Sequence, residues 1–242
     1  MDSNHKPYNH IDSARRIKDY LTSTKQDFEE VDALPDREKL TFSNGFYASC
    51  SAIFVDIRES SKLPSHYKRP RLARIYRAYL SELVAIFNGH PKAREINIAG
   101  DAAWAVINTP YTPDIDTVFT LGYEANSMAQ ILNYEMRKAS YDHPIKIGIG
   151  MSYGRALMIK AGYSGSGIND VVYMGDVVNE AAKLANHGNS SWNVPALVTS
   201  EDFYINLNDH NQGLLKYDYS RKCYTGEVIS KEMQAWFDEN CK

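Results

Sequence analysis

Two aspartates of this 242-residue chain occupy positions from which they could bind a metal ion. Asp56 comes at the tip of the apolar run FYASCSAIFVDI, and Asp101 follows Gly100 in the middle of EINIAGDAAWAVIN. Magnesium and manganese prefer such carboxylate oxygens and take a few of them together with substrate phosphates. The alternative for each aspartate is the solvated polar end of a strand or turn, with no chemical role.

A second pair, Asn179 and Lys183, stands four residues apart in YMGDVVNEAAKL, so both side chains share one face of a helix. A neutral donor and a cation directed together can stabilise the charge that develops on phosphate oxygens. The alternative is an ordinary helix start followed by a solvated lysine.

The elements that must position these residues follow the order β-α-β-β-α-β, which is typical of an α+β sheet with helices on one face. The residue patterns predict strands over 46–57 and on both sides of Gly100–Asp101, and helices over 69–88 and 115–138. A crossover helix then returns the chain so that Asp56 and Asp101 meet at one edge of the sheet. Further along, IKIGIGMSYGRALMI predicts two strands around a glycine. VVYMGDVVNEAAKLANHG predicts a strand and a short helix ended by Gly188, and PALVTS predicts one more strand.

Composition separates an N-terminal extension, residues 1–45, from a domain over residues 46–242. Ala14, Ile17 and Leu21 predict a short helix in the extension, and residues 32–39 are interpreted as a linker. The net charge of −3 gives no support to nucleic-acid binding, and no apolar run has the length of a membrane span or a signal peptide. An odd number of cysteines without metal-type spacing (Cys50, Cys223 and Cys241) predicts reduced thiols and a cytoplasmic protein.

Four stretches together resemble the catalytic domain of class III nucleotidyl cyclases, over roughly residues 46–199. FVDIRESS and EINIAGDAAWAVI resemble the two metal motifs of that family, and IKIGIGMSYGRAL resembles its glycine-bearing hairpin. VVYMGDVVNEAAKLAN resembles the helix that carries the catalytic asparagine. The resemblance implies an α+β class III cyclase fold: a ferredoxin-like βαββαβ sheet core with helices on one face and added C-terminal elements.

The resemblance also implies a composite active site in a homodimer. Two divalent ions, Mg²⁺ or Mn²⁺, would be bound by Asp56, Asp101 and the Ile57 carbonyl, and Asn179 and Lys183 would come from the opposite subunit to orient the ribose and stabilise the transition state. The turn that would hold the terminal phosphates comprises Arg58, Glu59 and Ser60. Two positions depart from the family pattern, because Lys183 replaces an arginine and Glu59 stands where glycine is common.

The positions that would recognise the base match neither purine pattern of the family. Adenylyl cyclases use a lysine and an aspartate or threonine there, and guanylyl cyclases use a glutamate and a cysteine. This chain has Asn97 and Val172. Phe46 or Tyr47 could stack on a small base, with core packing as the alternative.

The segment LTFSNGFYASCSAIFVDIRESSKL, which leads into the domain, resembles the stand-alone cyclases of bacterial Pycsar antiphage systems. Those enzymes make cyclic UMP or cyclic CMP, which activates a separate effector. The prediction is therefore a uridylate cyclase that acts on UTP. A cytidylate cyclase, an adenylate cyclase that recognises its base with other residues, and a catalytically dead nucleotide- or partner-binding module remain as alternatives. A two-metal polymerase or diguanylate cyclase is disfavoured by the single AGDAA turn.

Overall fold

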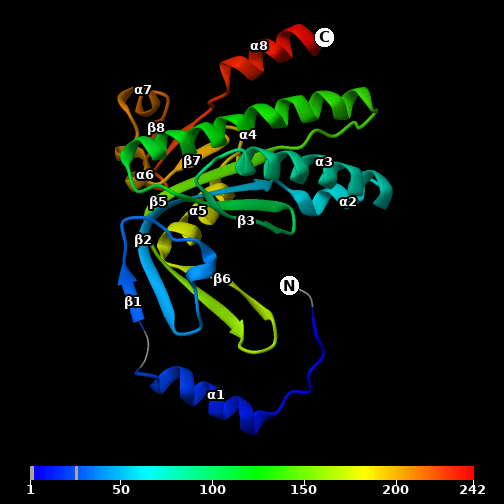
Figure 1. The fold of residues 1–242 in the computed structure, drawn as a ribbon. Coiled ribbons are helices and arrows are strands. Elements are labelled where there is room, and N and C mark those ends of the chain that lie inside the picture. The colour runs from blue at the N-terminus through cyan, green and yellow to red at the C-terminus, as the bar shows by residue number, and fades with distance from the viewer. Residues whose placement is uncertain (1–2, 25–26) are drawn as a thin grey trace.

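The computed structural model describes residues 3–24 and 27–242, and the predicted β-α-β-β-α-β unit forms the centre of the molecule (Figure 1). The unit consists, in chain order, of β2 (Asn44–Ile57), α3 (Arg69–Asn88), β3 (Ala93–Ala99), β4 (Ala102–Asn108), α4 (Thr112–Lys138) and β5 (Ile147–Tyr163). The predicted α+β fold class is confirmed.

The other elements precede this unit, link its parts or follow it. They are α1 (His10–Thr22), β1 (Asp27–Glu30), the 3₁₀ helices η1 (Arg37–Lys39) and η2 (Ser60–Lys62), α2 (Leu63–His66), β6 (Ile168–Met174), α5 (Asp176–His187), β7 (Leu197–Thr199), α6 (Glu201–Ile205), α7 (Asp209–Gln212), β8 (Lys216–Asp218), β9 (Cys223–Gly226) and α8 (Lys231–Asn240). The predicted helix in the extension, the short helix ended by Gly188 and the late strand are confirmed as α1, α5 and β7.

The main sheet runs in the order β3-β4-β2-β5-β7-β9-β8, with β1 added beside β2 and β6 beside β5. The central strand β2 is antiparallel to both of its long neighbours, β4 and β5. Its register sets Asp56 opposite Ala102, the first residue of β4. The end of β2 therefore lies beside the Gly100–Asp101 turn, as the sequence predicts.

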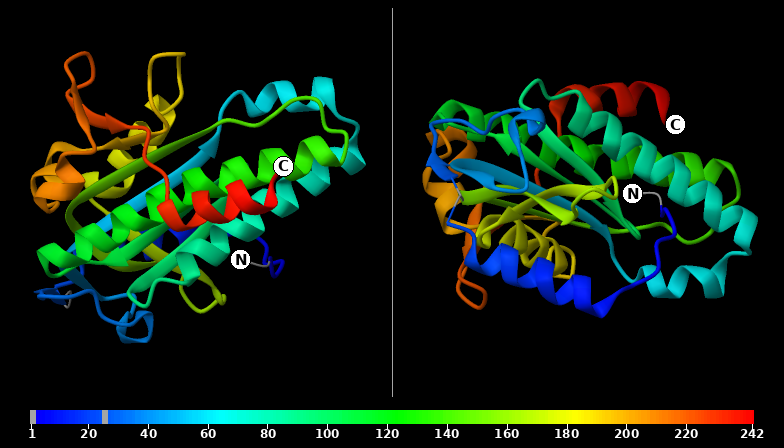
Figure 2. Two further views of the ribbon diagram at one scale, coloured as in Figure 1. Left: turned by 90° about the horizontal axis from the view of Figure 1, so that it is seen from above. Right: turned by 60° about the horizontal axis from the view of Figure 1, so that its bottom comes forward.

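The two faces of the sheet are covered differently. Ile53 and Val55 of β2 pack in the hydrophobic cluster that includes α3 and α4, and Figure 2 shows these two helices side by side over the strands. The alternate residue Ala52 faces the other way and packs in a second cluster with Val177 and Ala181 of α5. The predicted helical layer is thus α3 and α4, whereas the short helix α5 lies on the opposite face.

The glycines of β5 allow close helix packing and form no turn. The prediction of two strands over this stretch is wrong, because β5 continues unbroken from Ile147 to Tyr163. A Cβ atom at Gly150 would lie 2.0 Å from the Ala181 carbonyl oxygen, and one at Gly148 would lie 2.1 Å from that of Ala185. Since only a residue without a side chain lets the backbone of α5 approach this closely, both glycines are required inside the strand.

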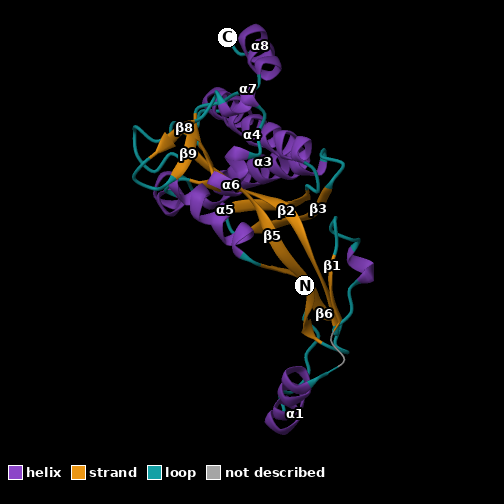
Figure 3. Cartoon of the chain, turned by 90° about the vertical axis from the view of Figure 1, so that its left-hand side faces the viewer, coloured by secondary structure: helices purple, strands orange, loops and turns teal. Residues whose placement is uncertain are grey.

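The N-terminal segment contacts the sheet at several points. α1 lies at one end of the molecule, with α8 at the other (Figure 3), and the Arg16 guanidinium stands 4.8 Å from the Tyr163 ring centroid. Leu34 and Leu40 are buried in the same cluster as α5. The domain boundary at residue 45 stays a prediction. Among the described residues, no helix is both long and apolar enough to cross a bilayer.

Candidate active site

The structure brings Asp56 and Asp101 together at the end of the sheet. Asp56 is half-buried on β2, and its carboxyl lies within hydrogen-bonding reach of Asp101 in the β3–β4 turn. Burial and then the negative charge of Asp101 raise the pKa of Asp56 to about 6, against the opposing effect of the Arg58 charge. The fold therefore holds two carboxyl groups close enough to repel each other when both are ionised.

This pair fits the divalent metal ions that the cyclase fold implies. Both groups offer hard oxygen ligands, and a bound cation would relieve the repulsion between the two carboxylates. Ile57 follows Asp56 directly, and its buried hydrocarbon side chain has no ligand atom, so its backbone carbonyl is the only group it could offer to a metal ion. The ligand set Asp56, Ile57 and Asp101 stays a prediction that the carboxylate geometry supports.

Arg58 connects the carboxylate pair to α5. Its Nη2 lies 2.6 Å from Asp56 Oδ2, and its Nη1 donates to the backbone oxygen of Asn186 at 2.7 Å. The Arg58 side chain is 11% exposed and the Asp56 side chain 32%, so the ion pair is shielded from solvent mainly on the arginine side. Asn186 belongs to the last turn of α5, and this contact therefore fixes that end of the helix next to the carboxylate pair.

The turn after Ile57 places Glu59 in a backbone shape that favours glycine. Glu59 has φ +54°, in the left-handed region, at a cost of about 1 kcal/mol for a residue with a side chain. Its exposed carboxylate forms an ion pair with Lys62 of η2, which begins at Ser60. The Arg58 amide donates to the Lys146 carbonyl at 2.8 Å and is thus already engaged. Phosphate binding by this turn stays a prediction.

Asn179 and Lys183 are both exposed on α5 and share one side of the helix. They stand two residues before and two residues after Ala181, which packs against the sheet. With 3.6 residues per turn, both side chains therefore leave the helix on the side opposite the sheet. In a single chain they are directed away from β2, which carries Asp56.

The proposed base positions differ in their surroundings. Asn97 on β3 donates through its side-chain amide to Glu95 Oε1 at 3.2 Å, and the Glu95 side chain is only 8% exposed. Val172 on β6 is 41% exposed. Asn97 is thus part of a polar cluster, whereas Val172 lies on a solvent-facing stretch of strand.

Residues that the sequence analysis did not single out complete this cluster. Arg37 of η1 lies 3.9 Å from Glu95 and 3.0 Å from Asp170 of β6, so it links β3 to β6. Glu95 Oε2 and the Tyr173 hydroxyl are buried and lack a hydrogen-bond partner among the described residues. Glu95 could have been predicted from the alternation of side chains along β3, because it faces the same side of the strand as Asn97. No local pattern in the sequence predicts the contact between Arg37 and Glu95.

The aromatic residues proposed for base stacking have other contacts. Phe46 is buried in the second cluster, which confirms core packing, and the Tyr47 ring lies 4.1 Å from the Arg155 guanidinium. A different pair, Phe54 and Trp104, stacks with ring centroids 5.4 Å apart on the face of the sheet that carries Asp56. An aromatic surface therefore exists near the carboxylate pair, formed by residues other than those predicted.

Comparison with known proteins identifies relatives over most of the chain, although no family model matches it. It is 37% identical over 239 residues to a uridylate cyclase of Treponema porcinum, a match that covers 96% of this chain and 82% of that protein. It is 42% identical over 213 residues to a uridylate cyclase of Gulbenkiania mobilis, covering 85% of this chain and 82% of that protein.

Solved structures with the same fold are class III cyclase domains. The adenylyl cyclase CyaB of P. aeruginosa superposes with a TM-score of 0.64 at 17% identity, over 77% of this chain and 96% of that one. A class III adenylyl cyclase-like ATP-binding protein from Pseudomonas aeruginosa gives a TM-score of 0.70 at 16% identity, over 93% of this chain and 48% of that one. The superpositions show that the chain has the fold of class III cyclase domains, and the sequence similarity shows that it belongs to the uridylate cyclase family.

Proposed function

We propose that the chain converts UTP to 3′,5′-cyclic UMP and pyrophosphate. The observation that carries this proposal is the Asp56–Asp101 pair, present in a chain 37% and 42% identical to two proteins named uridylate cyclase. In this reaction the ribose 3′-oxygen bonds to the α-phosphorus. The bond from that phosphorus to the oxygen bridging to the β-phosphate breaks, pyrophosphate leaves with the electron pair, and the hydroxyl proton passes to solvent.

The chain's own residues prepare the carboxylate pair for this reaction. Asp56, Asp101 and the Ile57 carbonyl would hold two Mg²⁺ or Mn²⁺ ions, which lower the pKa of the ribose hydroxyl and neutralise triphosphate charge when bound. Arg58 donates to Asp56 Oδ2 and so favours the ionised form of a carboxyl whose burial favours the protonated form. Arg58 thereby keeps Asp56 in the state that can bind a cation.

The active form is proposed to be a homodimer in which Asn179 and Lys183 act on the partner's substrate. The direction of these two side chains supports this arrangement, because they leave α5 on the side away from their own sheet. Asn179 would orient the ribose, and Lys183 would balance the negative charge that develops on the α-phosphate. Lysine supplies this charge without the planar fork of arginine.

The polar cluster around Asn97 supports recognition of a pyrimidine. Glu95 accepts from the Asn97 amide nitrogen, which leaves the Asn97 carbonyl oxygen as an acceptor for a substrate donor. The N3–H group of uracil is such a donor, whereas the exposed Val172 side chain offers no hydrogen bond to the adenine edge. Because cytosine also presents a donor, in its amino group, CTP is the substrate that the experiment must distinguish from UTP.

The product is proposed to be a second messenger that activates a separate effector in the cytoplasm, as part of antiphage defence. The resemblance of the segment that leads into the domain, LTFSNGFYASCSAIFVDIRESSKL, to stand-alone Pycsar cyclases supports this role. In this role the effector is a partner that binds the product of the enzyme, so the effector needs no direct contact with the chain.

The decisive experiment offers each of the four ribonucleoside triphosphates, then an equimolar mixture, to the purified chain with Mn²⁺ or Mg²⁺. Products are identified by mass spectrometry, and the Asp56→Asn variant serves as the control for contaminating cyclases. We expect cyclic UMP to dominate. If cyclic CMP dominates, the substrate is CTP and not UTP. If cyclic AMP or cyclic GMP dominates, the assignment of a pyrimidine substrate is wrong.

A further inference from the structure

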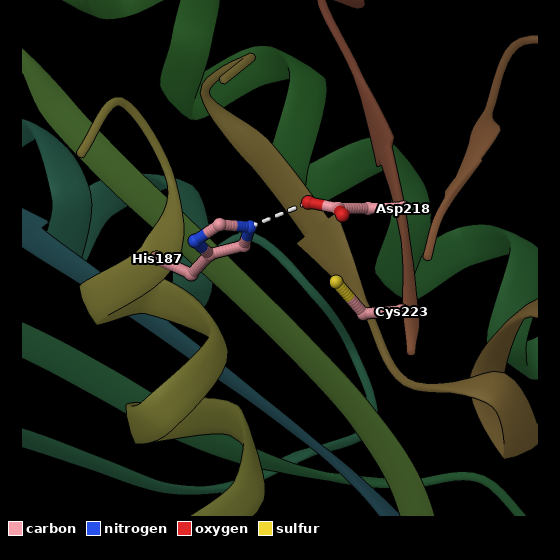
Figure 4. Close-up of side chains that lie close together, drawn as sticks. All are labelled: His187, Asp218 and Cys223. Atoms are coloured by element: carbon pink, nitrogen blue, oxygen red, sulfur yellow. Dashed lines mark hydrogen bonds and ion pairs between the residues drawn. The ribbon is translucent and has the colours of Figure 1, made fainter. Parts of the chain in front are cut away.

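A second cluster of metal-ligand side chains lies outside the proposed cyclase site. His187 is the last residue of α5, Asp218 ends β8 and Cys223 begins β9, and Figure 4 shows the three side chains directed toward one another. His187 Nε2 lies 2.8 Å from Asp218 Oδ2, and one ligand atom from each of the three residues lies within 4.8 Å of the other two. Three separate segments of chain therefore converge on a volume the size of one coordination sphere.

The donor atoms define the class of metal that suits this cluster. A nitrogen, a carboxylate oxygen and a sulfur are the ligands that Zn²⁺ accepts in tetrahedral sites, whereas Mg²⁺ and Ca²⁺ select oxygen ligands. Three protein ligands leave a fourth position for water. The hollow beside the cluster is lined by His187, Ser190, Asp218 and Ser220, so solvent has access to that position.

Neighbouring residues orient two of the three ligands. Asp218 Oδ1 accepts from the Ser220 amide at 2.8 Å and from its hydroxyl at 2.6 Å, which leaves Oδ2 directed to His187. On the far side of the imidazole, Nδ1 lies 3.4 Å from Ser190 Oγ, so that Nε2 is the nitrogen presented to the cluster. Metal sites in proteins are built with such outer partners, which fix the tautomer and the ring orientation.

The third ligand is fixed by the β8–β9 hairpin. Cys223 pairs directly with Asp218 in the ladder, so the two ligands are held opposite each other on adjacent strands. The Cys223 side chain is buried, whereas His187 and Asp218 are 11% and 21% exposed. The cluster thus has a closed side at the sulfur and an open side at the hollow.

We propose that His187 Nε2, Asp218 Oδ2 and Cys223 Sγ form a zinc site that joins the end of α5 to the β8–β9 hairpin. On binding, the Cys223 thiol releases its proton to solvent as the sulfur–metal bond forms. The proton that His187 Nε2 shares with Asp218 Oδ2 in the metal-free protein moves to Nδ1 or to solvent, which frees the Nε2 lone pair for the ion. His187 follows Asn186, which accepts from Arg58, so the ion would fix the end of α5 beside the residue that orients Asp56. None of the three ligands belongs to the residues assigned to the nucleotide or to the Asp56–Asp101 pair.

Cobalt is the probe that tests this proposal, because a thiolate bound to Co²⁺ gives a charge-transfer band in the near ultraviolet. The full chain is stripped with a chelator and titrated with Co²⁺, and we expect a thiolate band that saturates at about one ion per chain. Zn²⁺ should displace the cobalt and abolish the band. The Asp56→Asn, Asp101→Asn double variant should keep the band, which separates this site from the carboxylate pair.

Variants assign the band to the proposed ligands. Cys223→Ser should lose it, whereas Cys241→Ser, at a cysteine outside the cluster, should titrate like the wild type. His187→Gln and Asp218→Asn should weaken Co²⁺ binding by at least about tenfold. The absence of a thiolate band in the wild type, or its persistence in Cys223→Ser, would overturn the proposal. If the Cys223→Ser variant does not fold, the His187→Gln variant provides the test. A folded His187→Gln variant that binds Co²⁺ with the affinity of the wild type would also overturn the proposal.

Discussion

The two proposed metal sites of this chain differ in what holds their residues together. Asp56 and Asp101 are like charges, and their proximity, together with burial, raises the pKa of Asp56 to about 6. His187 and Asp218 attract each other, and hydrogen bonds from Ser220 and His187 lower the pKa of Asp218 to about 2. The carboxylate pair therefore opposes folding when it is ionised, whereas the His187–Asp218 contact supports it.

This difference indicates which cluster the fold maintains for chemistry. A group kept in an unfavourable electrostatic environment persists only where the surrounding structure determines its position, and such groups concentrate at functional sites. Here β2, β4 and Arg58 supply that support for Asp56. The His187–Asp218–Cys223 cluster needs no such support, because His187 and Asp218 attract each other.

The largest expected effect is the loss of turnover when either carboxylate is removed. Asp56→Ala or Asp101→Ala should lower kcat/KM by at least ~1000-fold, because the metal ions supply several kcal/mol of transition-state stabilisation. Asp142→Asn, at an exposed loop position, is the matched control and should retain activity. Circular dichroism checks that each variant is folded. Turnover near the wild-type rate in either variant would remove the carboxylate pair from the mechanism.

The next effect is the recovery of activity in mixed dimers. Asp56→Ala and Lys183→Ala are each expected to be inactive. An equal mixture should reach about a quarter of the wild-type rate, because half of the dimers are mixed and each of those has one intact site. Subunit exchange is followed independently with two affinity tags. If mixed dimers form and remain inactive, Asp56 and Lys183 do not act in the same composite site.

A smaller effect is expected at the polar cluster near the base. Asn97→Leu should lower kcat/KM for UTP by about ten- to a hundredfold, because the base and Glu95 each lose a hydrogen-bond partner. Val172→Ala, at the exposed position on β6, should change kcat/KM by less than about threefold, since no hydrogen bond is lost. The measurement is kcat/KM for UTP and CTP in parallel. Equal effects of the two substitutions would contradict the role given to Asn97.

Removing the charge of Asp101 should stabilise the metal-free protein. The pKa of Asp56 is raised from 3.8 to about 6 in the folded state, so the wild type loses stability as the pH rises through that window. Asp101→Asn lowers this pKa, and should therefore raise the free energy of unfolding by about 1 kcal/mol above about pH 7, with little effect near pH 4. Urea unfolding with chelator present measures both values. A loss of stability at high pH would show that repulsion does not dominate at this pair.

The matching substitution in the other cluster should have the opposite sign. His187→Ala removes the hydrogen bond to Asp218, and should lower the free energy of unfolding by about 1–2 kcal/mol without added metal. The same urea titration at neutral pH provides the measurement. A variant as stable as the wild type would mean that the His187–Asp218 contact does not help to hold α5 against the hairpin.

Local patterns predicted much of the fold and the meeting of Asp56 and Asp101. The order of apolar runs and helical faces predicted β2, α3, β3, β4 and α4, and with them the meeting of Asp56 and Asp101. The pattern failed at β5, where glycine was interpreted as a turn signal. Glycine also occurs where another backbone comes close, and the approach of α5 to Gly148 and Gly150 is not visible along the sequence.

The sequence alone determined features that depend on neighbouring elements: the chain order β-α-β-β-α-β, the meeting of Asp56 and Asp101, and the shared face of Asn179 and Lys183. Their geometry follows from the pleat of a strand and the period of a helix. Only the tertiary structure decided the contacts between distant segments: Arg58 with Asn186, Arg37 with Glu95, and His187 with Asp218 and Cys223. Those contacts depend on the way in which extended side chains and loops pack once the sheet has formed. The periodicity of residues along the sequence does not predict that packing.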